Sequence, residues 1–154
     1  MNWTHRLGRA LRAVWQLDWL ERVAVLRVIC AAFAVEVGLR LLSLPNLACR
    51  IGVQLESGVD ASPQAPRGLL RSEARLLRVA ELVFRDWPFG GPCLRRSLVC
   101  GFFLRSRRPV LKIGVTRNGG SMTAHAWIEI DGAPVLENHA QRECYSVLQP
   151  AVRA

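Results

Sequence analysis

The hydrophobic pattern divides the chain into a helical first half and a second half that changes from helix to strand. Residues 11–56 are rich in leucine, valine, alanine and isoleucine, and their most apolar stretch is 23–42. Pro45 and Asn46 predict a break after that stretch, because proline disfavours a helical conformation in the residue before it. Residues 57–67 are rich in serine, proline, glycine and alanine, as linkers are. We therefore expect a helical segment, a linker and then a further unit.

Beyond the linker, the spacing of apolar residues predicts two helices followed by strands. In residues 68–86 the apolar positions recur with the period of an amphipathic helix. A second helix is expected from Pro92, since proline is favoured in the first helical turn. Residues 109–116, 122–131 and 133–137 are separated by glycine-containing turns and predict strands, the middle one with clear alternation. This order predicts helices packed on a small antiparallel sheet.

The apolar stretch near the start is not expected to cross a membrane. Arg27, Glu36 and Arg40 interrupt it, and its longest uncharged run is 28–35. A transmembrane helix needs about 20 predominantly apolar residues. The stretch is therefore expected to be a core helix or an interfacial helix, which leaves peripheral membrane contact open.

The formal net charge of +9 comes almost entirely from arginine, and Lys112 is the single lysine. The arginines are scattered along the predicted helices, which favours a solvated basic face. An acidic peptide partner is the second interpretation. No basic strand with interleaved aromatic residues and no recognition-helix motif is present, so nucleic acid is not an expected partner.

The cysteine usage indicates a reducing compartment and a thiol with a chemical role. The chain has five cysteines and no CxxC pair, and its first residues lack the short apolar run of a secretory signal. We therefore expect a cytoplasmic protein without a disulfide framework. Among the cysteines, Cys93 follows Pro92 directly, whereas Cys100 lies along the same helix and Cys30 lies amid apolar residues. Cys93 is the candidate nucleophile.

The expected position of Cys93 at a helix start suits thiol chemistry. Backbone N–H groups there have no partner within the helix, and the helix dipole favours negative charge. Both effects stabilise a thiolate, the reactive form of cysteine. The same N–H groups are candidate donors to an oxyanion on the attacked carbonyl.

His125 is the candidate base. It alternates with Ala124 and Ala126 on the predicted strand 122–131, so it is expected to share a face with Trp127 and Glu129. Its small neighbours leave it accessible to a helix. A core histidine or a cross-strand partner of Glu129 is the alternative interpretation. A Cys–His pair needs a third group to orient the imidazole.

The third group is expected on the return strand, across the turn from His125. Glu137 is the predicted orienting residue, and Asp131 and Asn138 are alternatives. A zinc site is the rival use of such side chains, but the spacing of its candidate ligands matches no established zinc pattern. Those candidates are Cys93, His125, His139 and Cys144. We expect neither a metal nor a cofactor.

The ordered segments CLRRSL, LKIGVT and AHAWIEIDG resemble the transglutaminase-like B protein of lasso-peptide biosynthesis. The matching residues are Cys93, Leu94, Arg96, Ser97, Gly114, Val115, His125, Ala126, Trp127, Glu129, Asp131 and Gly132. The resemblance is close over roughly the last 65 residues, where the helix and two strands match a papain-like triad in order. The family's third catalytic residue is an aspartate shortly after the turn, and this sequence has Glu137 there.

The resemblance implies an α+β fold, with N-terminal helices followed by a papain/transglutaminase-like core in which the catalytic helix packs on a small antiparallel sheet. It implies a cysteine protease that removes the leader peptide from a ribosomally made precursor before an asparagine-synthetase-like cyclase closes the macrolactam. Residues 1–66 show no strands of a fused leader-recognition domain, so a separate small leader-binding protein is expected. The implied organisation is a helical segment at 1–56, a linker at 57–67 and the protease core at 68–154. Acyl transfer on the same scaffold and a non-catalytic precursor-binding module are the alternatives.

Overall fold

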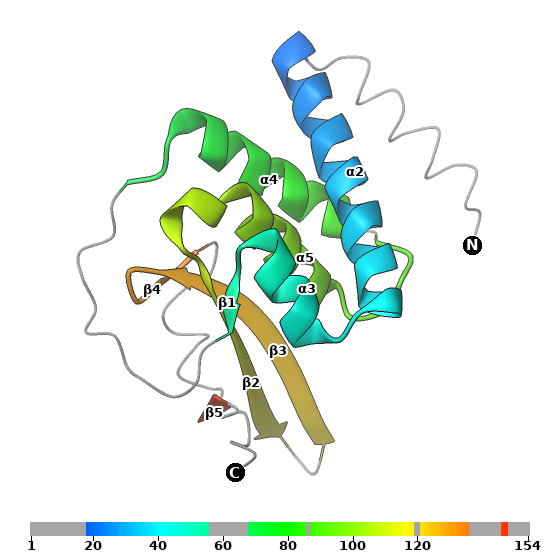
Figure 1. The fold of residues 1–154 in the computed structure, drawn as a ribbon, viewed down its shortest axis with the longest axis vertical. Coiled ribbons are helices and arrows are strands. Elements are labelled where there is room, and N and C mark those ends of the chain that lie inside the picture. The colour runs from blue at the N-terminus through cyan, green and yellow to red at the C-terminus, as the bar shows by residue number, and fades with distance from the viewer. Residues whose placement is uncertain (1–17, 56–67, 86, 119–120, 136–145, 148–154) are drawn as a thin grey trace.

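The computed structural model describes residues 18–55, 68–85, 87–118, 121–135 and 146–147 (Figure 1). The helices are α2 (Trp19–Leu41), α3 (Leu44–Ile51), α4 (Arg71–Arg85), α5 (Pro92–Phe103) and the short 3-10 helix η1 (Arg105–Arg107). The strands are β1 (Gln54–Leu55), β2 (Val110–Asn118), β3 (Ser121–Ile130), β4 (Ala133–Pro134) and β5 (Ser146–Val147).

The helices precede the β2–β3 hairpin, as the hydrophobic pattern predicts, and the α+β fold class is confirmed. The amphipathic helix expected over 68–86 is α4, which buries Leu77, Ala80 and Phe84 among others. The apolar stretch 23–42 lies in α2. Of the helices in the described ranges, none combines the length and apolarity needed to cross a bilayer.

The break after α2 differs from its predicted position. The chain turns at Leu42 and Ser43, ahead of Pro45, and α3 already begins at Leu44. Pro45 and Asn46 therefore start a helix and do not interrupt the chain. The reason is that the fixed φ of proline suits the first helical turn, where its missing N–H removes no helical hydrogen bond.

The sheet is mixed, where the sequence predicted an antiparallel one. Strands β2 and β3 form a long antiparallel hairpin, and β4 and β5 pair antiparallel with β3 and β2. Strand β1 runs parallel to β2 and comes from the segment expected to contain only helix and linker. Glycine at position 52, with a φ of 76°, ends α3 in the left-handed conformation and directs the chain into β1. Of the return strand expected over 133–137, the structure shows β4 at Ala133–Pro134, and residues 136 and 137 lie outside the described residues.

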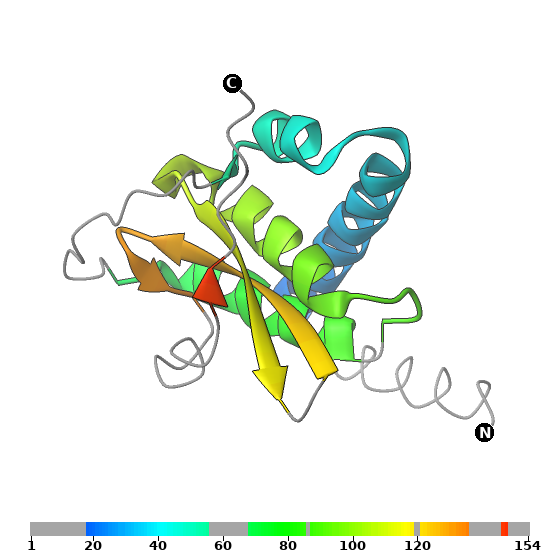
Figure 2. The same cartoon turned by 90° about the horizontal axis from the view of Figure 1, so that it is seen from below.

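Helix α5 lies at the centre of the molecule. It packs against β3 and β2 on one side and against α4 and α2 on the other (Figures 1 and 2). Gly101 allows the approach of the chain leading to β1, because a Cβ atom there would lie 2.5 Å from Cγ2 of Val53. The core includes residues of α2 and α3 as well as of α4 and α5. The boundaries 1–56, 57–67 and 68–154 stay a prediction, and 57–67 lies outside the described residues.

Candidate active site

Cys93 is the second residue of α5, as the sequence predicted. Gly91 is the N-cap and adopts a left-handed conformation with φ of 64°, which favours glycine. Pro92 follows as the first helical residue, and Cys93 is half-buried. Since the first N–H groups of a helix have no acceptor within it, the turn that carries Cys93 has backbone donors without a partner inside α5. This arrangement suits a thiolate and an oxyanion.

The first turn of α5 is held in place by an ion pair with α2. The Nε of Arg95 donates to Oε2 of Glu36 at 2.5 Å, and Nη1 of Arg95 donates to the carbonyl oxygen of Gly90. Glu36 is buried and also accepts from Nε of Arg40 at 3.2 Å. The hydrogen bond from Arg95 is the main reason why the pKa of Glu36 lies below its ordinary value. Glu36, one of the charged residues that interrupt the apolar stretch of α2, therefore holds the start of α5, the helix that carries Cys93.

Aromatic side chains hold the loop that precedes Cys93. The ring of Trp87 lies 4.9 Å from that of Phe84 and 5.7 Å from that of Phe89, between centroids. It also meets Phe33 of α2 edge-on at 5.9 Å. The loop is thus packed against α4 and α2 before it enters α5.

His125 lies on β3, directly opposite Gly114 of β2. Residues paired across an antiparallel ladder share a face of the sheet. Because Gly114 has no side chain, it leaves space beside the imidazole. The imidazole ring is nearly parallel to the indole of Trp127, at 18° and 6.1 Å between centroids. This contact confirms the expected shared face of His125 and Trp127.

A buried polar row continues from Trp127 along the same face. Nε1 of Trp127 donates to Oε1 of Glu129 at 3.0 Å. Oε2 of Glu129 lies 3.3 Å from Nζ of Lys112 on β2, and both side chains are almost fully buried. Glu129 therefore has an indole and an ammonium as partners. Its contacts fix the orientation of the indole that stacks on His125.

Ser97 fastens α5 to the strand that carries His125. It lies one helical turn after Cys93, and its hydroxyl donates to the carbonyl oxygen of Ala126 at 2.9 Å in a buried setting. Ala126 is the neighbour of His125 in sequence. One hydrogen bond thus connects the helix of the candidate nucleophile with the strand of the candidate base.

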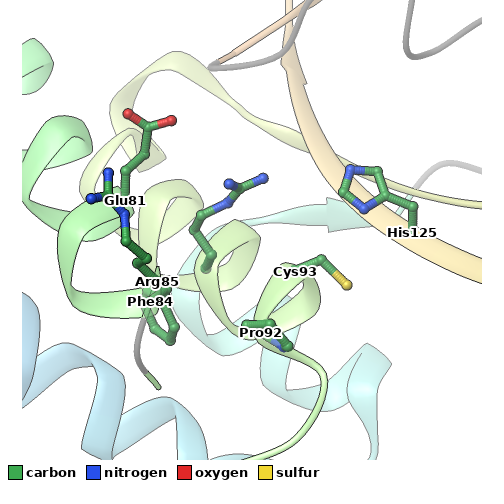
Figure 3. A pocket seen from close by; sticks show the side chains of 7 residues that line it. Glu81, Phe84, Arg85, Pro92, Cys93 and His125 are labelled. Atoms are coloured by element: carbon green, nitrogen blue, oxygen red, sulfur yellow. The ribbon is translucent and has the colours of Figure 1, made fainter.

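Cys93 and His125 line the same pocket, which has a volume of about 420 Å³ (Figure 3). The remaining lining residues are Glu81, Phe84, Arg85, Pro92 and Arg96. The pocket therefore combines a thiol at a helix start, an imidazole on a strand and charged side chains at its border. Its size lies within the range of roughly 300–1,000 Å³ that is usual for ligand pockets.

The other described cysteines lie in different surroundings. Cys100 is buried, as expected, and burial raises the pKa of its thiol to about 12. A thiol with that pKa is protonated near neutral pH and is a poor nucleophile. Cys30 and Cys49 are exposed, although Cys30 lies in an apolar stretch of sequence.

The predicted orienting residues are only partly within the described structure. Glu137 and Asn138 lie outside the described residues, as do the zinc candidates His139 and Cys144. Asp131 has a positive φ of 52° in the turn after β3 and lines a second pocket with Arg107 and Arg108. That turn is about 20 Å along the strand from His125. The structure therefore does not bring Asp131 to the imidazole.

A family model described as transglutaminase-like superfamily matches residues 31–149, which is most of the chain. The chain belongs to the transglutaminase-like superfamily. The match begins inside α2, so it includes helical residues that carry no motif of their own. No curated protein and no solved structure matches the chain.

Membership in the transglutaminase-like superfamily agrees with the observed order of helices and strands. The scaffold is of the cysteine protease or acyltransferase type. In this transglutaminase-like chain, the shared pocket is lined by Cys93 from α5 and His125 from β3. Metal-ligating side chains do not form a cluster of three or more within the described ranges.

Several site residues received no role from the sequence. Ser97 and Trp127 belong to the segments that resemble the lasso family, but their contacts depend on the packing of α5 on β3. Glu36 carried one local signal, which is a carboxylate in an otherwise apolar helical stretch. Its partner Arg95 lies far away in sequence, so no local pattern connects the two.

Proposed function

We propose that this protein is a cysteine protease that removes the leader peptide from a ribosomally made lasso-peptide precursor. The observation that carries the proposal is the shared pocket of Cys93 and His125, with the thiol at the start of a helix. The membership in the transglutaminase-like superfamily supports a thiol-based acyl chemistry. The resemblance of the segments around both residues to the lasso-peptide B proteins supports the substrate.

In the proposed reaction the sulfur of Cys93 attacks the peptide carbonyl at the junction of leader and core. His125 takes the thiol proton and passes it to the amine of the core peptide as the carbon–nitrogen bond breaks. The leader remains as a thioester on Cys93. Water, deprotonated by His125, then attacks the thioester and releases the leader with a free carboxylate, and the proton returns to the sulfur.

Backbone donors are expected to stabilise the negative charge that develops on the carbonyl oxygen. The N–H groups of the first turn of α5 are the proposed donors, since helix geometry leaves them without acceptors inside the helix. Glu137 is the proposed partner of the imidazole. A carboxylate in that role fixes the tautomer of the histidine and stabilises the imidazolium.

The proposed partners follow from the same family resemblance. The leader peptide binds with a separate small leader-recognition protein, and an asparagine-synthetase-like cyclase receives the free core peptide. The proposed setting is a reducing cytoplasm, in which the thiol of Cys93 stays reduced.

The direct test is cleavage of a precursor peptide in the presence of the leader-recognition protein. We expect Cys93→Ala and His125→Ala to abolish cleavage while Cys49→Ala, an exposed cysteine outside the pocket, leaves it unchanged. Full cleavage by the Cys93→Ala variant would sink the proposal.

Analysis of the products separates the remaining functions. Hydrolysis gives a leader with a free carboxylate, whereas acyl transfer gives a leader joined to an amine, and mass spectrometry distinguishes them. A non-catalytic precursor-binding module would bind the peptide without any product, and its Cys93 would not be labelled preferentially by an alkylating reagent.

A further inference from the structure

Helix α2 is apolar on two opposite faces. Its inner face packs on α4 and α5 and buries small residues such as Ala24 and Ala32, while Gly38 lies against Leu47 of α3. Its opposite face carries apolar side chains spaced alternately by four and three residues, which we call the outer seam. The outer seam consists of Trp19, Val23, Leu26, Cys30, Phe33 and Val37. Alternating steps of four and three are the spacing with which one helix packs along another.

The outer seam exposes large apolar side chains. The exposed fractions reach 71% for Trp19, 63% for Leu26 and 53% for Phe33. A surface helix normally has a single apolar face, which it turns to the core. Helix α2 lies at the edge of the molecule, on the side of α4 and α5 away from the sheet (Figures 1 and 2).

The exposed area is of the size that a protein interface uses. The exposed large apolar residues of α2, which include Leu20 and Leu41 beside the seam, present on the order of 600 Å². A standard interface buries about 800 Å² per partner. A patch of this size is at the upper end of the roughly 300–600 Å² that the largest apolar patch of a typical monomer reaches, and such patches are often functional.

We propose that the outer seam pairs with the outer seam of a second copy of this chain, with the two α2 helices antiparallel. In one register every seam residue meets a seam residue of the other copy. Trp19 then faces Val37, Val23 faces Phe33, and Leu26 faces Cys30 of the second copy. Each large side chain meets a smaller one, which is the condition for close packing. The two-fold axis passes near the middle of the seam, so the interface is self-complementary.

Charges beside the seam are complementary in this register. Arg40 of one copy lies beside Asp18 of the other, and both side chains are at the surface. The arginine nearest the axis, Arg27, has its guanidinium 5.7 Å from the ring centre of Phe103 in its own chain. The net charge of +9 on each copy opposes association, but charges separated by more than about 8 Å are largely screened at physiological salt.

The first test compares two matched substitutions by light scattering coupled to size-exclusion chromatography. We expect the unaltered protein to have twice the mass of one chain. Leu26→Arg in the outer seam is expected to weaken the dimer at least about 100-fold, because it places an unpaired charge in an apolar contact. Leu82→Arg on α4 is the control, since Leu82 is 59% exposed and lies outside the seam. A monomer at all concentrations, or a dimer that both substitutions leave intact, overturns the proposal.

The second test determines the register by oxidative cross-linking. Leu26→Cys is expected to form an intermolecular disulfide with Cys30 of the second copy, and the additional substitution Cys30→Ser should abolish it. In the antiparallel register the unaltered protein does not cross-link through Cys30. A Cys30–Cys30 disulfide in the unaltered protein would indicate parallel helices and overturn the proposed pairing. Two other results would also overturn the pairing. One is a monomer that floats with anionic vesicles and loses this binding on Leu26→Arg substitution. The other is a protein that dimerises through the seam only after residues 1–17 have been removed. Neither arm uses catalytic activity, so the outcome is independent of the proposed function.

Discussion

The hydroxyl of Ser97 provides the sharpest test of how the fold positions the candidate site. Its hydrogen bond of 2.9 Å to the carbonyl oxygen of Ala126 is buried and connects α5 with β3. Ser97→Ala removes the donor and changes little else, since the two side chains differ only by the oxygen. A buried hydrogen bond contributes about 1 kcal/mol net, and an acceptor left without a partner costs about 1–3 kcal/mol. We therefore expect a loss of about 1–2 kcal/mol in the free energy of unfolding.

Urea denaturation followed by circular dichroism measures this loss. The midpoint is expected to fall while the slope stays the same, which indicates a change in stability without a change in the exposed surface. Ser72→Ala is the control, because Ser72 is exposed in the first turn of α4. Its free energy of unfolding should stay within about 0.5 kcal/mol of the unaltered protein.

The same substitution is expected to slow precursor cleavage about 10- to 100-fold, because a displacement near 1 Å between reacting groups costs about 100-fold in rate. A Ser97→Ala variant with unchanged stability and unchanged cleavage would refute the reasoning. Unchanged cleavage with lowered stability would restrict Ser97 to a structural role.

Further predictions concern the packing of α5 and the buried charges. Gly101→Ala should lower the free energy of unfolding by about 1–3 kcal/mol, because the added methyl group overpacks the contact with Val53. Combining it with Val53→Ala should restore part of that loss in a double-mutant cycle. Additive losses would contradict the close contact. Glu36→Gln should destabilise the protein at neutral pH, measured by denaturant titration. Because the folded-state pKa of Glu36 lies below its ordinary value of 4.5, its stabilising contribution is present above that value and is lost as the pH falls through the folded-state pKa. The difference between Glu36→Gln and the unaltered protein should therefore shrink on acidification, and a difference independent of pH would exclude this origin. Glu129→Met should lower the free energy of unfolding by about 3–5 kcal/mol, because it leaves the buried Lys112 without that partner. The double substitution Lys112→Met and Glu129→Met should lower it by less. Equal losses for the single and the double variant in thermal melts would argue against the ion pair.

The sequence predicted the features that depend on local patterns. Pro92 predicts the start of α5 and therefore the position of Cys93, and both agree with the structure. Alternation over 122–131 predicts β3 and the shared face of His125 and Trp127. These predictions succeed because helix starts and strand alternation depend on neighbouring residues.

Features that depend on packing between distant segments were not predictable in this way. Strand β1 has two residues, too few for a pattern, and its place on β2 depends on the small size of Gly101. The pairing of Glu36 with Arg95 joins helices far apart in sequence. Apart from Trp19, the outer seam of α2 lies within the apolar stretch 23–42. Because α2 has apolar residues on both faces, the sequence of that stretch does not show which residues face the core.

The central claim is that Cys93 is the nucleophile that attacks the leader–core carbonyl with His125 as its base. The measurement that tests it most directly is peptide mapping after inactivation by a leader peptide that ends in a chloromethyl ketone. We expect one modified residue, Cys93, with loss of cleavage in proportion to its modification and a much slower reaction in the His125→Ala variant. Modification spread over the exposed Cys30 and Cys49, with cleavage retained, would contradict the account.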